Sequence, residues 1–149
     1  MTHHPVSIRA GLLAALASIA LAGCGAMSES SSTSFQGVMN AASQVPPNAA
    51  RGTGMAEAWL DKRNNTLRYK IIYIGLTGPA TAAHFHGPAA AGANAAVALP
   101  FAKADSPIEG TATLTAAQAA DLVAGKWYVN VHTAAHPGGE IRGQLLPRM

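Results

Sequence analysis

The chain has little of what most catalytic and redox sites are built from. It holds one cysteine, Cys24, in 149 residues, and only 11% of its residues are charged. Because Cys24 closes an N-terminal leader, the domain that follows has no thiol. Disulfides, iron–sulfur clusters, thiolate copper sites and cysteine nucleophiles are therefore excluded from that domain. Any metal must be held by nitrogen and oxygen ligands, and stability must come from a hydrophobic core.

Charge of either sign is too sparse to form a strongly charged surface. Ten Lys and Arg face seven Asp and Glu, and the basic residues are scattered without interleaved aromatic residues. A nucleic-acid groove or a basic lipid-binding patch is therefore not indicated, and we expect no nucleic-acid partner. No Ser-His-Asp spacing, phosphate loop or pair of catalytic carboxylates is present to support a hydrolase or a kinase.

The N-terminus predicts export and lipidation. Residues 10–22 form an uncharged, mostly apolar run that ends in Leu21-Ala-Gly-Cys24. This resembles a bacterial lipobox, so residues 1–23 are predicted to be a lipoprotein signal peptide and Cys24 the acylated first residue of the mature protein. The alternative, a membrane-spanning helix, needs about 20 apolar residues, more than this run provides. By resemblance to the sorting of known bacterial lipoproteins, Gly25 in place of Asp implies an outer-membrane anchor, facing the periplasm or the cell surface.

The rest of the chain predicts a short tether and one all-β domain. Residues 24–34 comprise the lipidated Cys24 and a Ser-rich tether, and folding is expected to begin at Phe35. Alternating apolar residues and turn signals then predict seven or eight short strands in an antiparallel Greek-key sandwich, over residues 35–146. The expected strands are 35–39, 54–60, 67–74, a strand through His84, 95–101, 110–114, 126–133 and 140–146. One short helix is predicted after Thr115, which with Gln118 forms a capping box.

The histidines outside the N-terminus lie in two short blocks. His84 and His86 are two residues apart in a predicted strand, so their side chains share a face. His132 ends a second predicted strand, and His136 follows in a Gly-Pro-rich loop. Neutral imidazole binds copper, zinc, iron and nickel, so these four residues are the candidate ligands of a transition metal. The alternative is that they stabilise turns through hydrogen bonds.

Two charged residues follow the last histidine, Glu140 and Arg142. On one strand face, Glu140 could accept a hydrogen bond from an imidazole N–H, and Arg142 could steer an anion toward the metal. A salt bridge that fixes an edge strand is the alternative, and it is the favoured interpretation.

Three separated motifs resemble the chordin-type domain, usually called CHRD. They are Ala83-His-Phe-His-Gly-Pro-Ala89, Leu114-Thr-Ala-Ala-Gln118, and the segment 127–145 from Trp127-Tyr-Val-Asn-Val-His132 to Gly143-Gln-Leu145. They occur in the family's order. The resemblance implies a β-rich fold and an extracytoplasmic location, and it says little about chemistry.

A weaker similarity links the histidine blocks to copper-zinc superoxide dismutase. In that family a His-x-His strand and a later Val-His supply copper ligands, as His84, His86 and His132 could here. This chain lacks a bridging histidine, a zinc aspartate and a disulfide. The similarity therefore implies one metal at a site of three or four histidines, and it speaks against a two-metal dismutase.

Three functions remain open from the sequence. The first is a lipid-anchored protein that binds copper, or alternatively zinc, through the histidines. The second is a non-catalytic module for a protein or glycan partner. The third is a dismutase-like copper redox enzyme, which has least support because a catalytic metal needs an open coordination position that a sequence cannot show.

Overall fold

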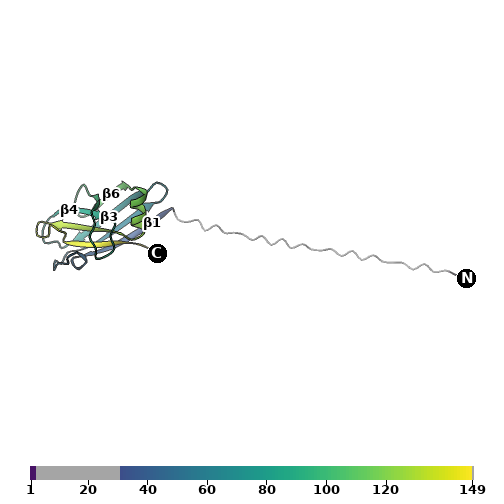
Figure 1. Ribbon diagram of the computed structural model, residues 1–149, viewed down its shortest axis with the longest axis horizontal. Coiled ribbons are helices and arrows are strands. Elements are labelled where there is room, and N and C mark those ends of the chain that lie inside the picture. The colour runs from purple at the N-terminus through teal and green to yellow at the C-terminus, as the bar shows by residue number, and fades with distance from the viewer. Residues whose placement is uncertain (3–30, 149) are drawn as a thin grey trace.

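Eight antiparallel strands, one short α-helix and the 3-10 helix η1, Ala41–Ser43, make up the domain in a computed structural model, which describes residues 1–2 and 31–148 (Figure 1). The predicted signal peptide beyond residue 2, Cys24 and most of the tether lie outside the described residues. Among the described residues, no helix has the length and apolar character needed to cross a membrane. The strands are β1 Ser32–Asn40, β2 Thr53–Asp61, β3 Thr66–Ile74, β4 Ala80–His86, β5 Val97–Pro100, β6 Ile108–Thr113, β7 Trp127–Thr133 and β8 Ile141–Pro147.

The strands form one strongly curled, half-barrel sheet in the order β5-β4-β7-β8-β1-β2-β3-β6. Neighbouring strands are antiparallel throughout. The prediction of an all-β antiparallel fold with one short helix is therefore confirmed. β4 and β7, which carry the candidate histidines, are neighbours near one end of this order, and β8 is internal to it.

The curl of the sheet encloses an apolar core. Tyr69 of β3 and Phe85 of β4 lie in strands with four others between them, yet their rings meet edge to face at 5.3 Å. Trp127 of β7 belongs to the same core and lies 5.9 Å from Phe85 between ring centroids. Phe85 is fully buried, and such burial contributes roughly 1.5–3 kcal/mol per large apolar side chain. The core thus holds the two ends of the sheet together.

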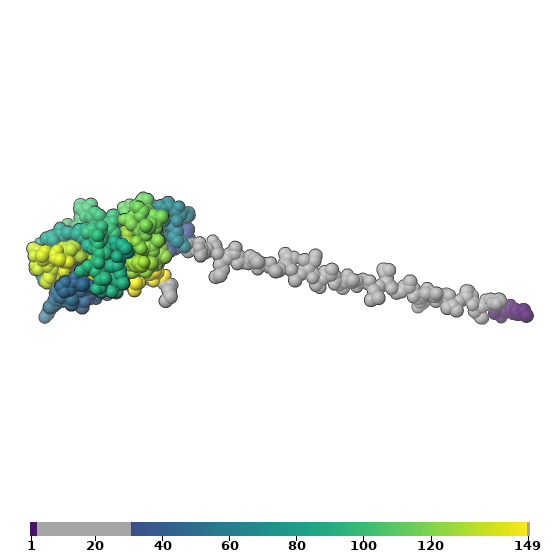
Figure 2. All heavy atoms as spheres, viewed as in Figure 1, coloured from purple at the N-terminus to yellow at the C-terminus, as the bar shows by residue number. Residues whose placement is uncertain are grey.

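The helix α1, Ala116–Val123, covers the end of the sheet at which β1 begins (Figure 1). In the space-filling view its residues pack beside the strands (Figure 2). The predicted capping box is present, since the Thr115 side chain accepts from the Gln118 N–H and the Gln118 side chain accepts from the Thr115 N–H. The helix ends at Val123 and is followed by Gly125, whose φ of +69° favours glycine.

The ordered domain starts earlier than the sequence suggested. Ser32, Thr33 and Ser34 already belong to β1, opposite residues 59–61 of β2. The prediction of a tether through Ser34 is wrong at its last three residues. Small hydroxyl side chains give no hydrophobic alternation, so the sequence does not indicate a strand here. Their backbone groups nevertheless pair with β2, because the register of β1 against β2 is already fixed by the residues that follow.

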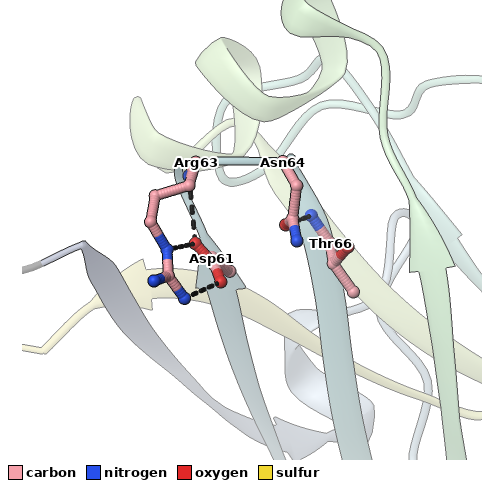
Figure 3. A network of polar contacts seen from close by, with 4 residues as sticks. All are labelled: Asp61, Arg63, Asn64 and Thr66. Atoms are coloured by element: carbon pink, nitrogen blue, oxygen red, sulfur yellow. Dashed lines mark hydrogen bonds and ion pairs between the residues drawn. The ribbon is translucent and has the colours of Figure 1, made fainter.

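The turn between β2 and β3 is held by local polar contacts (Figure 3). Asp61 accepts hydrogen bonds from the Arg63 side chain and from its backbone N–H, which together lower the pKa of Asp61 to about 2. Asn64 accepts from the Thr66 N–H in the same way. These contacts fix the register in which Leu67, Tyr69 and Ile71 face the core.

Candidate metal centre

The pairing of β4 with β7 brings the two histidine blocks together. His84 lies opposite Asn130, and Ala82 lies opposite His132. Because alternate residues of a strand share a face, His84, His86 and His132 all lie on the outer face of the curled sheet. The residues between them, among them Phe85 and Val131, face the core.

The three imidazoles are close enough to hold one ion. One ring nitrogen from each of His84, His86 and His132 lies within 4.8 Å of the other two. The ring centroid of His84 is 5.5 Å from that of His86 and 5.1 Å from that of His132. Around a tetrahedral zinc or copper ion with bonds of 2.0–2.1 Å, neighbouring ligand atoms lie about 3.3 Å apart. Small side-chain rotations would therefore close the group around a metal.

Backbone carbonyls orient two of the rings. His86 Nδ1 lies 3.0 Å from the Ala95 carbonyl oxygen, and His132 Nδ1 lies 2.9 Å from that of Pro137. A hydrogen bond from Nδ1–H to a backbone carbonyl is the contact that fixes the tautomer of metal-binding histidines. It leaves the lone pair of each ring on Nε2.

Both Nε2 atoms converge on the same oxygen. Asn130 Oδ1 lies 2.9 Å from His86 Nε2 and 3.0 Å from His132 Nε2. If both rings are neutral and donate from Nδ1, two nitrogen lone pairs face an oxygen that also carries lone pairs. A cation among these three atoms would remove that repulsion. Asn130 is therefore a fourth candidate ligand, through its amide oxygen.

The surroundings favour neutral imidazoles. Burial lowers the pKa of His86, and this effect outweighs the hydrogen bonds with Ala95 and Asn130. Burial also lowers the pKa of His84, and the neighbouring His132 and His86 lower it further. A metal binds only the neutral form, so the site keeps two of its rings ready for ligation to lower pH than a free histidine would be.

His84 carries a polar atom with no partner. Its Nδ1 is buried, and no hydrogen bond to it is found among the described residues. An unsatisfied buried nitrogen costs roughly 1–3 kcal/mol, so native structures rarely retain one without a reason. A bound ion, or a rotation of the ring that presents this nitrogen to one, would satisfy it.

A loop after β4 covers part of the site. Residues 87–96 turn back over the sheet, where the Ala95 N–H donates to the Tyr128 hydroxyl and the Gly87 N–H donates to the Ala96 carbonyl. His86, stacked on Tyr128 at 4.8 Å, is left 9% exposed, whereas His84 and His132 are half-buried. The site is thus sheltered at His86 and reachable at the other two rings.

The sequence of the domain matches one known protein family. The family model for the CHRD domain matches residues 35–145. The chain belongs to the CHRD domain family. Searches of the curated proteins and of the solved structures found no match to it. The resemblance of the three sequence motifs to this family is therefore confirmed. The matched residues include all three clustered histidines.

The structure does not bring His136 into this group. Its backbone N–H donates to the Thr133 carbonyl and hydroxyl at the turn after β7, and its side chain lies near enough to Glu140 to lower the pKa of that carboxyl. His136 is not among the described histidines whose ring nitrogens lie within 4.8 Å of one another. In the CHRD domain the candidate ligands are therefore His84, His86, His132 and Asn130.

The expectations for Glu140 need correction. Glu140 precedes β8, is fully buried, and accepts hydrogen bonds from the Thr77 N–H, the Thr77 hydroxyl and the Thr133 hydroxyl. It therefore supports the turn regions around Thr77 and Thr133, and none of the described imidazoles donates a hydrogen bond to it. Burial alone would raise the pKa of Glu140, but the bonds from the two threonines lower it overall.

Arg142 also differs from both sequence interpretations. β8 lies between β7 and β1, so it is not an edge strand, and none of the four ion pairs found among the described residues includes Arg142. Its guanidinium lies 3.5 Å over the Tyr128 ring and donates to the Ala93 carbonyl and to Asn94 Oδ1. It anchors the 87–96 loop.

Asn130 is the functional residue that the sequence did not single out. It lies two residues before His132 on the same face of β7, and directly opposite His84. The alternation Val129-Asn130-Val131-His132 carries that signal, because a polar residue between core residues must point to the outer face. Amide side chains are common on such faces, so only the pairing with β4 gives this one a role.

Proposed function

We propose that this CHRD domain binds a single transition-metal ion through His84, His86 and His132, with the amide oxygen of Asn130 as the fourth ligand. The observation that carries the proposal is the convergence of two Nε2 atoms on Asn130 Oδ1 beside an unpartnered nitrogen of His84.

Copper is the favoured ion. The donor set has three imidazoles, one neutral oxygen and no thiolate, and nitrogen-rich sites bind copper most tightly among the divalent first-row metals. Zinc is the second candidate ion, because it binds the same ligands at 2.0–2.1 Å. Since the set brings no carboxylate, the bound ion would keep its full positive charge, and an anion or water could complete its coordination.

The proposal includes a location. The Leu21-Ala-Gly-Cys24 motif supports export, acylation of Cys24 and attachment to a membrane outside the cytoplasm. A protein held there with one sheltered metal site is suited to buffer, carry or sequester copper. A redox role would need an open coordination position and turnover, and copper-loaded protein that removes superoxide catalytically would favour it instead.

The first experiment is a copper titration of the metal-free full chain, with His132→Ala beside His136→Ala as the matched control. The two histidines are four residues apart in the chain, but only His132 belongs to the cluster. We expect one Cu²⁺ per chain with a histidine-type visible spectrum, a loss of affinity of more than about 100-fold in His132→Ala, and little change in His136→Ala. Equal affinity in all three proteins would refute the site.

A second candidate function rests on exposed apolar side chains. Val38, Met55 and Ile72 lie side by side across β1, β2 and β3, and Val38 and Ile72 are 61% and 46% exposed. A patch of this kind favours a protein partner, as the sequence alternative of a binding module supposes. Val38→Lys with Ile72→Lys should abolish such an interaction and leave copper binding unchanged.

A further inference from the structure

Arg142 is one of the most deeply buried residues of the domain. It is 2% exposed, and its guanidinium is held by the Tyr128 ring, the Ala93 carbonyl and Asn94 Oδ1. All three contacts are with neutral groups. They use one N–H from each terminal nitrogen of the guanidinium, which has five N–H donors in total.

No carboxylate balances this charge among the described residues. Glu140 is the acidic residue nearest to Arg142 in sequence, and both of its carboxylate oxygens accept hydrogen bonds from Thr77 and Thr133. Burial lowers the pKa of Arg142, but arginine stays charged at any physiological pH. A buried charge without a counter-ion costs several kcal/mol, and buried charges in proteins are almost always paired.

Arg142 is one of the residues that line a cavity. A space of about 250 Å³ lies between the first turn after β1, the 87–96 loop and β8, and its lining includes Ser43, Gln44, Gly92, Arg142 and Gln144. Gln44 is 5% exposed, and its Nε2 has no hydrogen-bond partner among the described residues. The side-chain amide of Gln44 lies against Gly139, which is not part of this lining, so Arg142 is the charged donor of the cavity.

We propose that this cavity binds the carboxylate group of a small organic acid, with Arg142 as its donor. The guanidinium fork matches the two oxygens of a carboxylate, and charge-assisted bonds of this type are about twice as strong as neutral ones. A volume of about 250 Å³ is below the range of roughly 300–1,000 Å³ for drug-sized ligands, so the ligand is small.

This site is separate from the metal centre, although the two are neighbours. Asn130 lies between them on the sheet, since it pairs with His84 on one side and with Arg142 on the other. No imidazole lines the cavity. The proposal therefore holds whether or not a metal binds, and metal-free protein tests it alone.

The test is an NMR titration of the metal-free full chain with sodium acetate, following the Nε–Hε signal of Arg142. Acetamide serves as the probe of equal shape without charge, and inorganic phosphate as the competing oxyanion. We expect saturable shifts with acetate and none with acetamide. No saturable acetate response, an equal response to acetamide, or tighter binding of phosphate than of acetate would overturn the proposal.

Arg142→Met is a poor variant by itself, because it also releases the 87–96 loop. Ala42→Phe avoids this, since Ala42 is exposed and lines the cavity without contributing a hydrogen-bonding side chain. It should block the space and weaken acetate binding at least tenfold, while the matched control Ala117→Phe, on the exposed side of α1, should bind as the parent does. Unchanged binding in Ala42→Phe, with its fold intact, would also reject the site.

Discussion

The two faces of the β4–β7 strand pair are built from alternate residues of the same short segments, yet they obey different rules. The inner face holds Phe85, Val129 and Val131, all fully buried in contact with other apolar residues. The outer face holds His84, His86, Asn130 and His132, which are joined by directed polar contacts. One face is held by non-directional burial, and the other depends on where a few atoms point.

The difference between the faces separates stability from function. Burial of the inner face holds the curled sheet together and tolerates some change of shape, whereas the outer face has a use only if its nitrogen atoms meet. A substitution on the inner face should therefore alter the free energy of unfolding, and one on the outer face should alter ligand binding. Four predictions test this contrast.

The largest effect is expected from Phe85→Ala. It removes a fully buried ring that contacts Tyr69, Phe101 and Trp127, so it should lower the free energy of unfolding by about 3–5 kcal/mol. Urea unfolding followed by tryptophan fluorescence measures it. The neighbouring His84→Ala should cost far less, and a loss as large in both variants would contradict the division between the faces.

Glu140→Gln tests a buried polar group that lies outside the metal cluster. Its carboxylate accepts three hydrogen bonds from Thr77 and Thr133, and we expect a loss of about 1–3 kcal/mol in the free energy of unfolding at pH 7. Because the folded pKa of Glu140 is lowered, this stabilisation is complete above its unfolded pKa of about 4.3 and is lost as the pH falls further.

The difference between parent and Glu140→Gln should therefore shrink in acid. Unfolding midpoints measured from pH 7 to pH 3 would show it, with the exposed Glu109→Gln as the control that changes little. A gap that stays constant over this range would mean that the carboxylate is not charged in the folded state.

Asn130→Ala sharpens the role of the outer face. It removes the oxygen shared by His86 and His132 while keeping all three imidazoles, so copper affinity should fall about tenfold, equivalent to about 1.4 kcal/mol. Asn130→Asp should restore or exceed the parent affinity, because a carboxylate oxygen adds charge at the same point. Calorimetric titration compares the three proteins, and tighter copper binding by the alanine variant would exclude Asn130 as a ligand.

The smallest effect is expected at the exposed turn of Figure 3. Arg63→Ala should leave the unfolding midpoint nearly unchanged, since solvent screens an exposed ion pair. It should nevertheless raise the pKa of Asp61 from about 2 toward its ordinary value near 3.9, because the hydrogen bond from the Arg63 side chain is the main cause of the lowered pKa. Carboxyl chemical shifts followed against pH would measure this, and a stability loss as large as that of Glu140→Gln would be unexpected.

Much of the fold was predictable because its signals are local. Alternation in residues 67–73 placed Leu67, Tyr69 and Ile71 toward the core, and Thr115 with Gln118 marked the start of α1. The start of β1 was not predictable from the sequence, because residues 32–34 carry no apolar alternation. Among the site residues, the spacing of His84 and His86 gave their common face directly.

The sequence by itself determined which residues of the strand at 67–73 face the core, where the helix begins, that a metal must be held without thiolates, and which histidines are available. Only the tertiary structure decided that His132 meets His84 and His86 while His136 does not, that Asn130 lies among them, and that Arg142 is buried beside a cavity instead of paired at an edge. These outcomes depend on which strands become neighbours and on how the 87–96 loop folds back. Such contacts join residues far apart in the chain, and no local pattern specifies them.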